Sequence, residues 1–260
     1  MERDFSETLQ ALAQKGVRYA TVIDLGCADG NFFVDHFLQG LFQEAAPVNI
    51  DPNPIYEDSL AQIRATFGGH YRLAAASDTL GEIEITVSAH PYWSSLRPHG
   101  DLYWERVNKL AGETRRVPSV RLDDLVEELD LAPPYLLKLD VQGAEAQALR
   151  GARKTLAQTN VVICEADMAD FQAINAELVA AGFDLYDITV LQRLGDGTLG
   201  WFYPVYLSQR LAHIKPRRFW QEANNARVIE KQVQRRQQIL ARLAEMLPQI
   251  RAARAARKTG

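Results

Sequence analysis

The sequence is poor in cysteine and has no long apolar run. Only two of its 260 residues are cysteines, Cys27 and Cys164, and no stretch reaches the ~20 uninterrupted apolar residues of a membrane span. The first ten residues, MERDFSETLQ, lack the basic and apolar regions of a secretory leader. These absences predict a cytoplasmic protein. We expect both thiols to be reduced, because their strands should be separated by a third strand, beyond the ~7 Å limit for a disulfide.

Composition and charge indicate one globular domain with an appendage. Apolar residues make up 47% of the chain and charged residues 24%, as in ordinary globular proteins. Residues 1–212 hold 17 basic and 30 acidic residues, whereas residues 213–260 hold 12 basic residues and 3 glutamates. We therefore expect a domain over 1–212 and a basic extension over 213–260.

The extension has the pattern of a long amphipathic helix, kinked near Pro248. Apolar residues recur at steps of three and four, with two arginines in the same register: Val233, Arg236, Leu240, Leu243, Leu247, Ile250 and Arg254. Three partners compete for this stripe: the acidic domain or a second subunit, nucleic acid, and an anionic membrane surface. We favour docking on protein, including a homo-oligomer, because an acidic domain repels the phosphates of nucleic acid.

Residues 22–32, VIDLGCADGNF, predict a strand, a turn and a helix that together bind a nucleoside. Small residues at alternate positions let a ligand lie against the backbone, and the helix start offers free N–H groups. The competing interpretation is a turn that only packs the helix on the sheet. The residues expected to line this part of the cofactor site are Asp24, Gly26, Cys27, Ala28, Gly30 and Asn31.

Two further strand ends extend this site. The run VNIDPNP ends a second strand at Asp51, whose carboxylate can accept hydrogen bonds from both ribose hydroxyls. Pro52 stops the strand, and we expect Pro52 and Asn53 to line the cofactor site beside Asp51. A third strand ends at Ser77 and Asp78, where the adenine is usually met in such folds. The alternative for Asp51 is a cap of the next helix or turn.

Acidic residues in the first turn separate two candidate cofactors. A dinucleotide places its pyrophosphate on the helix start, and the carboxylates of Asp24 and Asp29 would repel it. The ammonium and sulfonium groups of S-adenosylmethionine suit an acidic turn, so the loop favours that cofactor.

The segment PYLLKLDVQGAEAQALRGA, residues 134–152, resembles the signature of the FkbM family of S-adenosylmethionine-dependent methyltransferases. That family reads roughly K-I-D-V-E-G-A-E, then a helix and Gly-Ala. The positions that match are Lys138, Asp140, Val141, Gly143, Ala144, Glu145, Gly151 and Ala152. The resemblance covers about residues 20–190. It departs at Gln142, where the family usually has Glu, and at Asp51, where many members have Glu.

The resemblance implies an α/β, Rossmann-like class I methyltransferase fold. With the patterns along the chain, we expect a mostly parallel sheet with an antiparallel strand at one edge and a C-terminal amphipathic helix. Strands are expected over 20–25, 48–51, 71–76, 81–87, 115–122, 135–141, 160–165, 183–188 and 201–207. Helices are expected over 6–15, 31–42, 56–66, 123–129, 144–156 and 170–181, with Asp123 as an N-cap.

Carboxylates at neighbouring strand ends are the candidate catalytic groups. Asp140 lies at the end of the fourth strand, where it can orient an acceptor hydroxyl and take its proton. We expect Asp140 also to contact the cofactor, Glu165 to act beside it, and His90 to be the next candidate base. Glu145 is either a substrate contact or a charge that favours the helix start. No full set of metal ligands is evident, so we expect no metal, with Mg²⁺ the alternative.

The irregular stretch from His90 to Trp104 is expected to choose the acceptor. Aromatic rings pack on the C–H faces of a sugar or on a planar ligand, although they can also simply hold a long loop in place. The candidate substrate contacts here are Tyr92, Trp93, Ser94 and Ser95. The favoured function is O-methylation of a hydroxyl on a carbohydrate or a glycosylated or secondary metabolite. The alternatives are an RNA or protein methyltransferase guided by the tail and a non-catalytic partner protein.

Overall fold

The computed structural model describes residues 4–87, 113–214 and 222–256. The chain divides into two compact units, Met1–Ala212 and His213–Gly260, which we call the body and the tail. None of the helices in the described ranges combines the length and apolar character needed to cross a bilayer.

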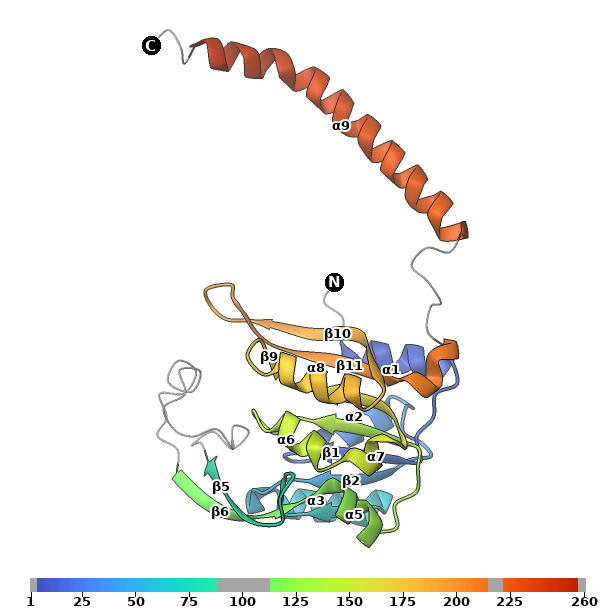
Figure 1. The fold of residues 1–260 in the computed structure, drawn as a ribbon, viewed down its shortest axis with the longest axis vertical. Helices are drawn as coiled ribbons and strands as arrows, with labels where there is room; N and C mark the ends of the chain where they lie inside the picture. The colour runs from blue at the N-terminus through green and yellow to red at the C-terminus, as the bar shows by residue number, and fades with distance from the viewer. Residues whose placement is uncertain (1–3, 88–112, 215–221, 257–260) are drawn as a thin grey trace. The chain divides into compact units, whose positions relative to one another are not determined.

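The body is built on an eight-stranded sheet (Figure 1) with the order β10-β11-β8-β7-β1-β2-β3, in which β9 pairs with β11. Strands β3, β2, β1, β7 and β8 run parallel, and β10 and β11 form an antiparallel edge. The strands of this sheet are β1 (Thr21–Leu25), β2 (Ala46–Ile50), β3 (His70–Arg72), β7 (Tyr135–Leu139), β8 (Thr159–Cys164), β9 (Ala166–Asp167), β10 (Phe183–Arg193) and β11 (Leu199–Ser208). The predicted fold class is confirmed.

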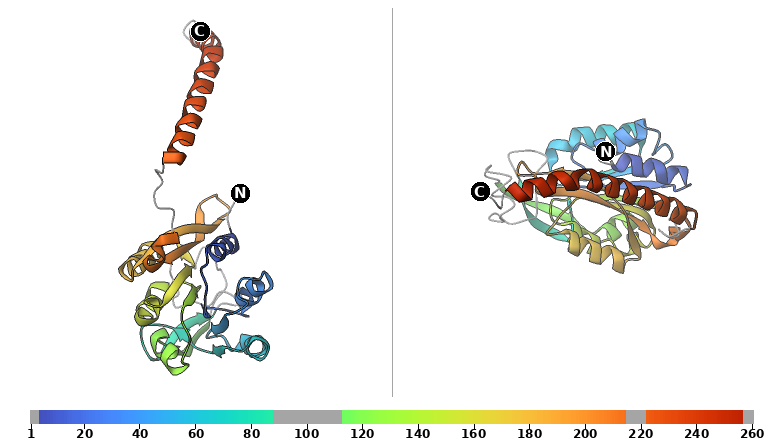
Figure 2. Two further views of the ribbon diagram at one scale, coloured as in Figure 1. Left: turned by 90° about the vertical axis from the view of Figure 1, so that its right-hand side faces the viewer. Right: turned by 90° about the horizontal axis from the view of Figure 1, so that it is seen from above.

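Helices cover both faces of this sheet, with α1, α2 and α3 on one side and α6, α7 and α8 on the other (Figure 2). The helices of the body are α1 (Phe5–Gln14), α2 (Asn31–Leu38), α3 (Glu57–Phe67), α5 (Leu122–Glu128), α6 (Glu145–Arg150), α7 (Arg153–Leu156) and α8 (Phe171–Ala180). Two 3₁₀ segments, η1 (Pro54–Tyr56) and η2 (Gln209–Ile214), complete the list. Every residue of β1 and β7 is buried, as expected for central strands that are covered on both faces. Their side chains are apolar apart from Thr21, Tyr135, Asp24 and Lys138.

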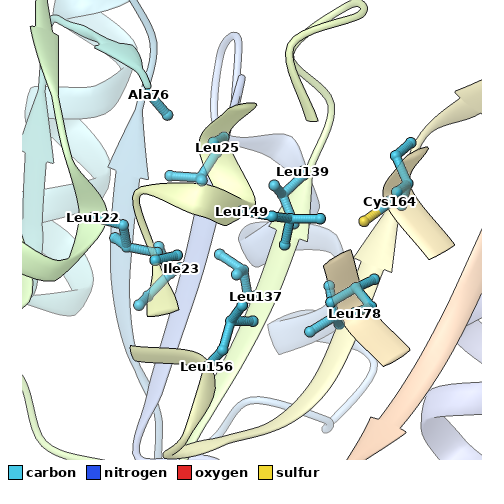
Figure 3. Close-up of a cluster of buried hydrophobic side chains, with 14 of the residues drawn as sticks. Ile23, Leu25, Ala76, Leu122, Leu137, Leu139, Leu149, Leu156, Cys164 and Leu178 are labelled. Atoms are coloured by element: carbon cyan, nitrogen blue, oxygen red, sulfur yellow. The ribbon is translucent and has the colours of Figure 1, made fainter. Parts of the chain in front are cut away.

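The larger hydrophobic core lies between the sheet and helices α5 to α8. Figure 3 shows its members from β1, β7 and β8 pointing toward leucines of these helices. They include Ile23, Leu25, Leu137, Leu139, Leu149, Leu156, Cys164 and Leu178. Because side chains alternate along a strand, Asp24 and Lys138 point to the opposite face, toward α1 and α2. Cys27 and Cys164 are buried free thiols, with β7 between their strands, as expected.

The expected third strand over 71–76 is wrong as a single element. His70–Arg72 pairs with β2, but β4 (Ala75–Ala76) pairs with β6 (Glu113–Val120), which also pairs with β5 (Gly81–Val87) in a separate three-stranded sheet. The chain leaves the main sheet after Arg72 because the backbone of residues 75–77 finds its hydrogen bonds on β6 instead. Ser77 N, for example, donates to Val120 O at 2.9 Å.

Two expectations about helix ends are also corrected. Asp123 does not cap α5. Its carboxylate accepts hydrogen bonds from the backbone N–H groups of Lys154 and Thr155, at 3.0 and 2.8 Å, so it caps α7. The single helix expected over 144–156 is broken at Gly151, where a Cβ would lie 2.1 Å from the backbone oxygen of Ser77. This close approach needs a residue without a side chain.

The tail contains α9 (Glu222–Ala256), a helix of 35 residues. The helix continues through Pro248, and Figure 1 shows a gradual curve along it. The predicted kink near Pro248 is not seen as a break in the helix. A curve without a sharp kink is the usual form of a long helix.

Candidate functional site

The turn from β1 to α2 is held closely against two other strand ends. Gly26 N and Cys27 N donate to Ile50 O, and Asp140 N donates to Leu25 O at 2.9 Å. Gly26 has a φ of 74°, and a Cβ there would lie 2.0 Å from the backbone oxygen of Asp140. The fold therefore requires glycine at this position, whether or not a ligand binds. The turn brings the first expected cofactor segment directly beside Asp140.

The far end of the same turn packs on α3. Gly30 is the N-cap of α2, with a φ of 79°, and a Cβ there would lie 2.5 Å from Ile63 Cδ1. Ala28 also has a positive φ of 47°, which is uncommon for a residue with a side chain. The competing interpretation, a turn that packs helix on sheet, thus explains Gly26 and Gly30. It does not explain the strained Ala28. Asn31 begins α2 at this point.

Asp51 follows β2 and ties the turn to the next loop. Its Oδ2 accepts a hydrogen bond from Ala28 N at 3.0 Å, and its Oδ1 accepts one from Asn53 N at 2.8 Å. Burial raises the pKa of Asp51 to about 6, although both backbone hydrogen bonds favour the charged form. Each carboxylate oxygen keeps a further lone pair for a ligand hydroxyl. Pro52 lies between Asp51 and Asn53. Asn53 is the N-cap of η1, and its Oδ1 accepts a hydrogen bond from Ile55 N.

Ser77 and Asp78 are held by side chains of α6. Gln147 Nε2 donates to Ser77 Oγ at 2.9 Å and to Asp78 Oδ1 at 3.1 Å. Arg150 forms an ion pair with Asp78 at 2.9 Å. Sequence reasoning missed Gln147, because no motif links a helix residue to a serine 70 positions earlier.

A row of polar side chains crosses the sheet beneath the turn. Asp24 of β1 lies between Asn49 of β2 and Lys138 of β7 in the strand register. Lys138 Nζ lies 3.0 Å from Asp24 Oδ1, 3.5 Å from Asp140 Oδ2 and 5.6 Å from the centre of the Phe32 ring. Burial alone would lower the pKa of Lys138, but the carboxylates of Asp24 and Asp140 raise it above its ordinary value. A buried ammonium therefore connects the turn to the end of β7.

Asp140 is the centre of a hydrogen-bonded cluster at the ends of β7 and β8, beside the middle of β11. Tyr203 Oη donates to Asp140 Oδ2 at 2.8 Å. Gln142 Nε2 donates to Asp140 Oδ1 at 2.8 Å and to Glu165 Oε2 at 2.5 Å. Gln142 adopts a left-handed φ of 54° to make this bridge. The Asp140 side chain is 21% exposed, so it remains accessible to a ligand.

The pKa values of the two carboxyl groups of the cluster are shifted in opposite directions. Burial would raise the pKa of Asp140, but the charge of Lys138 and hydrogen bonds from Glu165, Tyr203 and Gln142 hold it below its ordinary value. Burial and the negative charge of Asp140 raise the pKa of Glu165 well above its ordinary range. The environment therefore favours the ionised form of Asp140 and the protonated form of Glu165. Environments that separate the pKa values of two neighbouring acids are typical of catalytic sites.

Glu145 braces the loop that carries Gln142. Its Oε1 accepts a hydrogen bond from Val141 N at 2.9 Å, and its Oε2 accepts one from Gly143 N at 3.0 Å. The residue is buried, and burial raises its pKa to about 7. Because both oxygens are directed at backbone amides of the loop, this geometry favours the role at the helix start over a substrate contact.

Tyr203 is a second residue of the candidate site that sequence reasoning missed. It lies in an expected strand, but its contact with Asp140 depends on how β11 pairs with β8. Its ring packs on Phe5 of α1, with centroids 5.5 Å apart. Nothing in the local sequence marks it.

Several predicted residues lie outside the described ranges. They are His90, Tyr92, Trp93, Ser94 and Ser95. Within the described ranges there is no group of three His, Cys, Asp or Glu side chains arranged to hold a metal ion. Burial raises the pKa of the Cys27 thiol, which fits a packed loop residue and not a nucleophile.

A protein family and several solved structures are similar to this chain. The family model described as the methyltransferase FkbM domain matches residues 24–185. A crystal structure of methyltransferase FkbM from Methylobacillus flagellatus KT has 15% identity and a TM-score of 0.49, over 79% of this chain and 48% of that one. The present chain therefore spans about half the length of that protein.

Two other structures resemble the chain more distantly. Precorrin-6y C5,15-methyltransferase from Geobacter metallireducens GS-15 has 10% identity and a TM-score of 0.42, over 78% of this chain and 87% of that one. Streptococcus pneumoniae Sp1610, a putative tRNA (m1A22) methyltransferase in complex with S-adenosyl-L-methionine, has 13% identity and a TM-score of 0.42. The match covers 78% of this chain and 72% of that one. No curated protein sequence matches the chain.

Proposed function

Since this chain belongs to the FkbM methyltransferase domain family, which its residues 24–185 match, we propose that it transfers a methyl group from S-adenosylmethionine to a hydroxyl oxygen. The favoured acceptor is a carbohydrate or a glycosylated or secondary metabolite. The observation that carries the proposal is the pair Asp140 and Glu165, bridged by Gln142 and held beside the turn after β1, with pKa values shifted in opposite directions.

The residues around this turn fit the proposed cofactor. When bound, S-adenosylmethionine supplies a methyl group already activated by its sulfonium. Asp51 would accept hydrogen bonds from the ribose hydroxyls, since one lone pair on each of its oxygens is unused by Ala28 and Asn53. Ser77 and Asp78 would lie at the adenine end. Asp24 Oδ2 and Asn49 Oδ1 are buried with no hydrogen-bond partner among the described residues, so the polar row keeps unused acceptors beneath the turn.

Asp140 would perform two tasks for the acceptor. Its exposed carboxylate would accept a hydrogen bond from the acceptor hydroxyl and so orient the oxygen for attack. As the new O–C bond forms, the oxygen becomes positive and its proton becomes strongly acidic. A carboxylate of low pKa is then basic enough to take that proton. Lys138 and Tyr203 keep Asp140 ionised before the proton arrives.

Glu165 and Gln142 would act on Asp140 rather than on the acceptor. The carboxyl group of Glu165 and the amide of Gln142 would fix the rotation of the Asp140 side chain. A glutamate at position 142, which is usual in the family, would place a third carboxylate at this point. We propose that the change to glutamine lets the side chain donate to both acids at once.

Titration and acceptor screening test the proposal. Isothermal titration calorimetry should show micromolar binding of S-adenosylmethionine and its demethylated product, and no comparable binding of NAD. The protein should then transfer a labelled methyl group to members of a panel of saccharides and glycosylated metabolites, with mass spectrometry locating the methyl group on oxygen. In that assay Trp93→Ala should mainly raise the KM of the acceptor. Tight binding of NAD alone would exclude the proposal. If the methyl group were transferred only to RNA or protein, the proposed acceptor class would be wrong.

A further inference from the structure

Helix α9 carries an apolar stripe that its own side chains leave exposed. The exposed fractions of Ile229, Val233, Leu240 and Leu247 are 59%, 49%, 55% and 43%. These residues are four, seven and seven positions apart, and with Arg236, Leu243 and Ile250 they form a sequence register that alternates steps of four and three. The mean step is 3.5 residues, the repeat of a coiled coil, and it is maintained from Ala226 to Ile250. A stripe of this kind fits another helix.

We propose that α9 pairs with α9 of a second copy of this chain as an antiparallel coiled coil. In the register we infer, Leu240 of one copy lies opposite Leu243 of the other. The same register places Val233 opposite Ile250. The pairing is self-complementary about a two-fold axis, which is the commonest symmetry of soluble oligomers.

Arg236 decides between the two orientations. It occupies a core position of the heptad repeat, between Val233 and Leu240. In a parallel pair Arg236 would face Arg236 of the second copy, and two like charges would meet in the core. In the antiparallel register it lies opposite Leu247, where its aliphatic stem packs and its guanidinium reaches water.

The positions that flank the core support the same orientation. Antiparallel pairing places Glu230 beside Arg251 of the second copy, at both ends of the pair, and places Ile239 beside Met246. Parallel pairing would place Met246 beside Arg251 and form no flanking ion pair. Charge and apolar character are thus complementary in one orientation and mismatched in the other.

Between Ala226 and Ile250, the basic residues other than Arg236 lie at outer positions of the repeat and do not oppose the pairing. They are Arg227, Lys231, Arg235 and Arg242. A pair of helices would therefore present a basic outer surface to water. A nucleic-acid function would use this basic surface without needing the apolar repeat on the opposite face. A helix on a membrane would bury an apolar face but would not need the narrow 3.5-residue repeat.

The first experiment measures the mass of the full-length protein by size-exclusion chromatography with light scattering over a concentration series. The wild type should have twice the chain mass of 29.2 kDa. Leu240→Glu should reduce this to the mass of one chain, because it places a charge in the core of the pair. The matched control, Gln238→Glu, adds the same charge at an outer position and should remain a dimer. A wild type that is monomeric at all concentrations would overturn the proposal, whether or not it binds anionic vesicles or RNA.

The second experiment tests the orientation. Gln237→Cys with Ala244→Cys should give an oxidised cross-link between copies, because these positions face each other only in the antiparallel register. Gln232→Cys with Gln237→Cys should cross-link only in a parallel pair. Glu230→Arg should weaken the dimer, and adding Arg251→Glu should restore it. A dimer that is cross-linked only by the second cysteine pair, or that survives Leu240→Glu, would overturn the proposal.

Discussion

The body and the tail each carry residues in an unusual environment: the body has charged side chains in its interior, and the tail has large apolar side chains on its surface. The body buries charged groups, with Asp24, Lys138 and Glu145 all at most 7% exposed. Helix α9 instead exposes large apolar residues such as Ile229 and Leu240. Buried charge and exposed hydrocarbon both oppose stability, so each is informative where an exposed charge or a buried leucine is not.

The functions proposed for the body and for the tail rest on different kinds of evidence. In the body, function is inferred from contacts within one chain, such as the hydrogen bond between Tyr203 and Asp140. In the tail it is inferred from a pattern whose partner must come from outside the helix. Variants of the body should therefore change binding and rate, and variants of the tail should change assembly alone.

The largest effect is expected at Asp140. Asp140→Asn keeps the shape of the side chain and removes its charge, so the single-turnover rate of methyl transfer should fall by about 10²–10⁴. Cofactor affinity should change little. Asp124→Asn is the control, since Asp124 is an exposed acid that pairs with Arg121. A near-normal rate would show that the base lies elsewhere, with His90 the next candidate. The buried charges of the body would then not be explained by catalysis.

The second effect concerns Asp51 and cofactor binding. Asp51→Ala should weaken S-adenosylmethionine binding by about 1–3 kcal/mol, roughly 5- to 150-fold, because ribose hydroxyls lose their acceptor. Asp58→Ala, at an exposed position of α3, should have no effect. Calorimetry measures both. Equal affinities of the two variants would place the ribose elsewhere.

The same residue gives a pH dependence with a definite sign. Ribose hydroxyls donate to the carboxylate, so the ionised form of Asp51 should bind more tightly. Because the pKa of Asp51 is about 6, cofactor affinity should rise as the pH increases through about 6 and level off above it. Asp51→Asn should remove this dependence. A wild-type affinity that is flat across this range would show that Asp51 does not contact the cofactor.

Part of this site was predictable from the sequence, because some of its residues directly follow a recognisable strand. Asp51, Asp140 and Glu165 each follow a strand of a parallel sheet, and parallel strands end at one edge. Tyr203 could not be found this way, because its position is fixed by the antiparallel pairing of β11 with β8. Its contact joins residues 63 positions apart.

The errors in the fold have the same cause. The run over 71–76 has the pattern of one strand, but its second half pairs with β6, which lies far along the chain. Asp123 has the sequence signal of a helix N-cap and instead caps a different helix, α7. In the first case pairing with β6 replaces continued pairing with β2, and in the second a tertiary hydrogen bond replaces the local cap.

The third effect tests whether Tyr203 acts through Asp140. Tyr203→Phe removes one hydrogen bond to the ionised carboxylate, so the rate should fall roughly three- to tenfold. The pKa of Asp140 should rise, and the acid limb of kcat/KM should move to higher pH. Tyr186→Phe, which loses a hydroxyl on β10 that accepts a hydrogen bond from Lys15, is the control. A lower rate with an unchanged pH profile would indicate a purely structural role.

The smallest effect on the body is expected from removal of the tail. A chain that ends after Ile214 keeps η2 and every residue of the candidate site, so its affinity for S-adenosylmethionine should equal that of the full-length protein. Its mass in solution should fall to that of a single chain, because the truncation removes the apolar stripe of α9 together with the basic residues beside it. Calorimetry and light scattering on the same preparations separate these outcomes. If truncation weakened cofactor binding at constant mass, the tail would be part of the site and the division between body and tail would be wrong. If it changed neither, the stripe would have no protein partner, and a membrane or nucleic-acid function of the basic helix would become the better account.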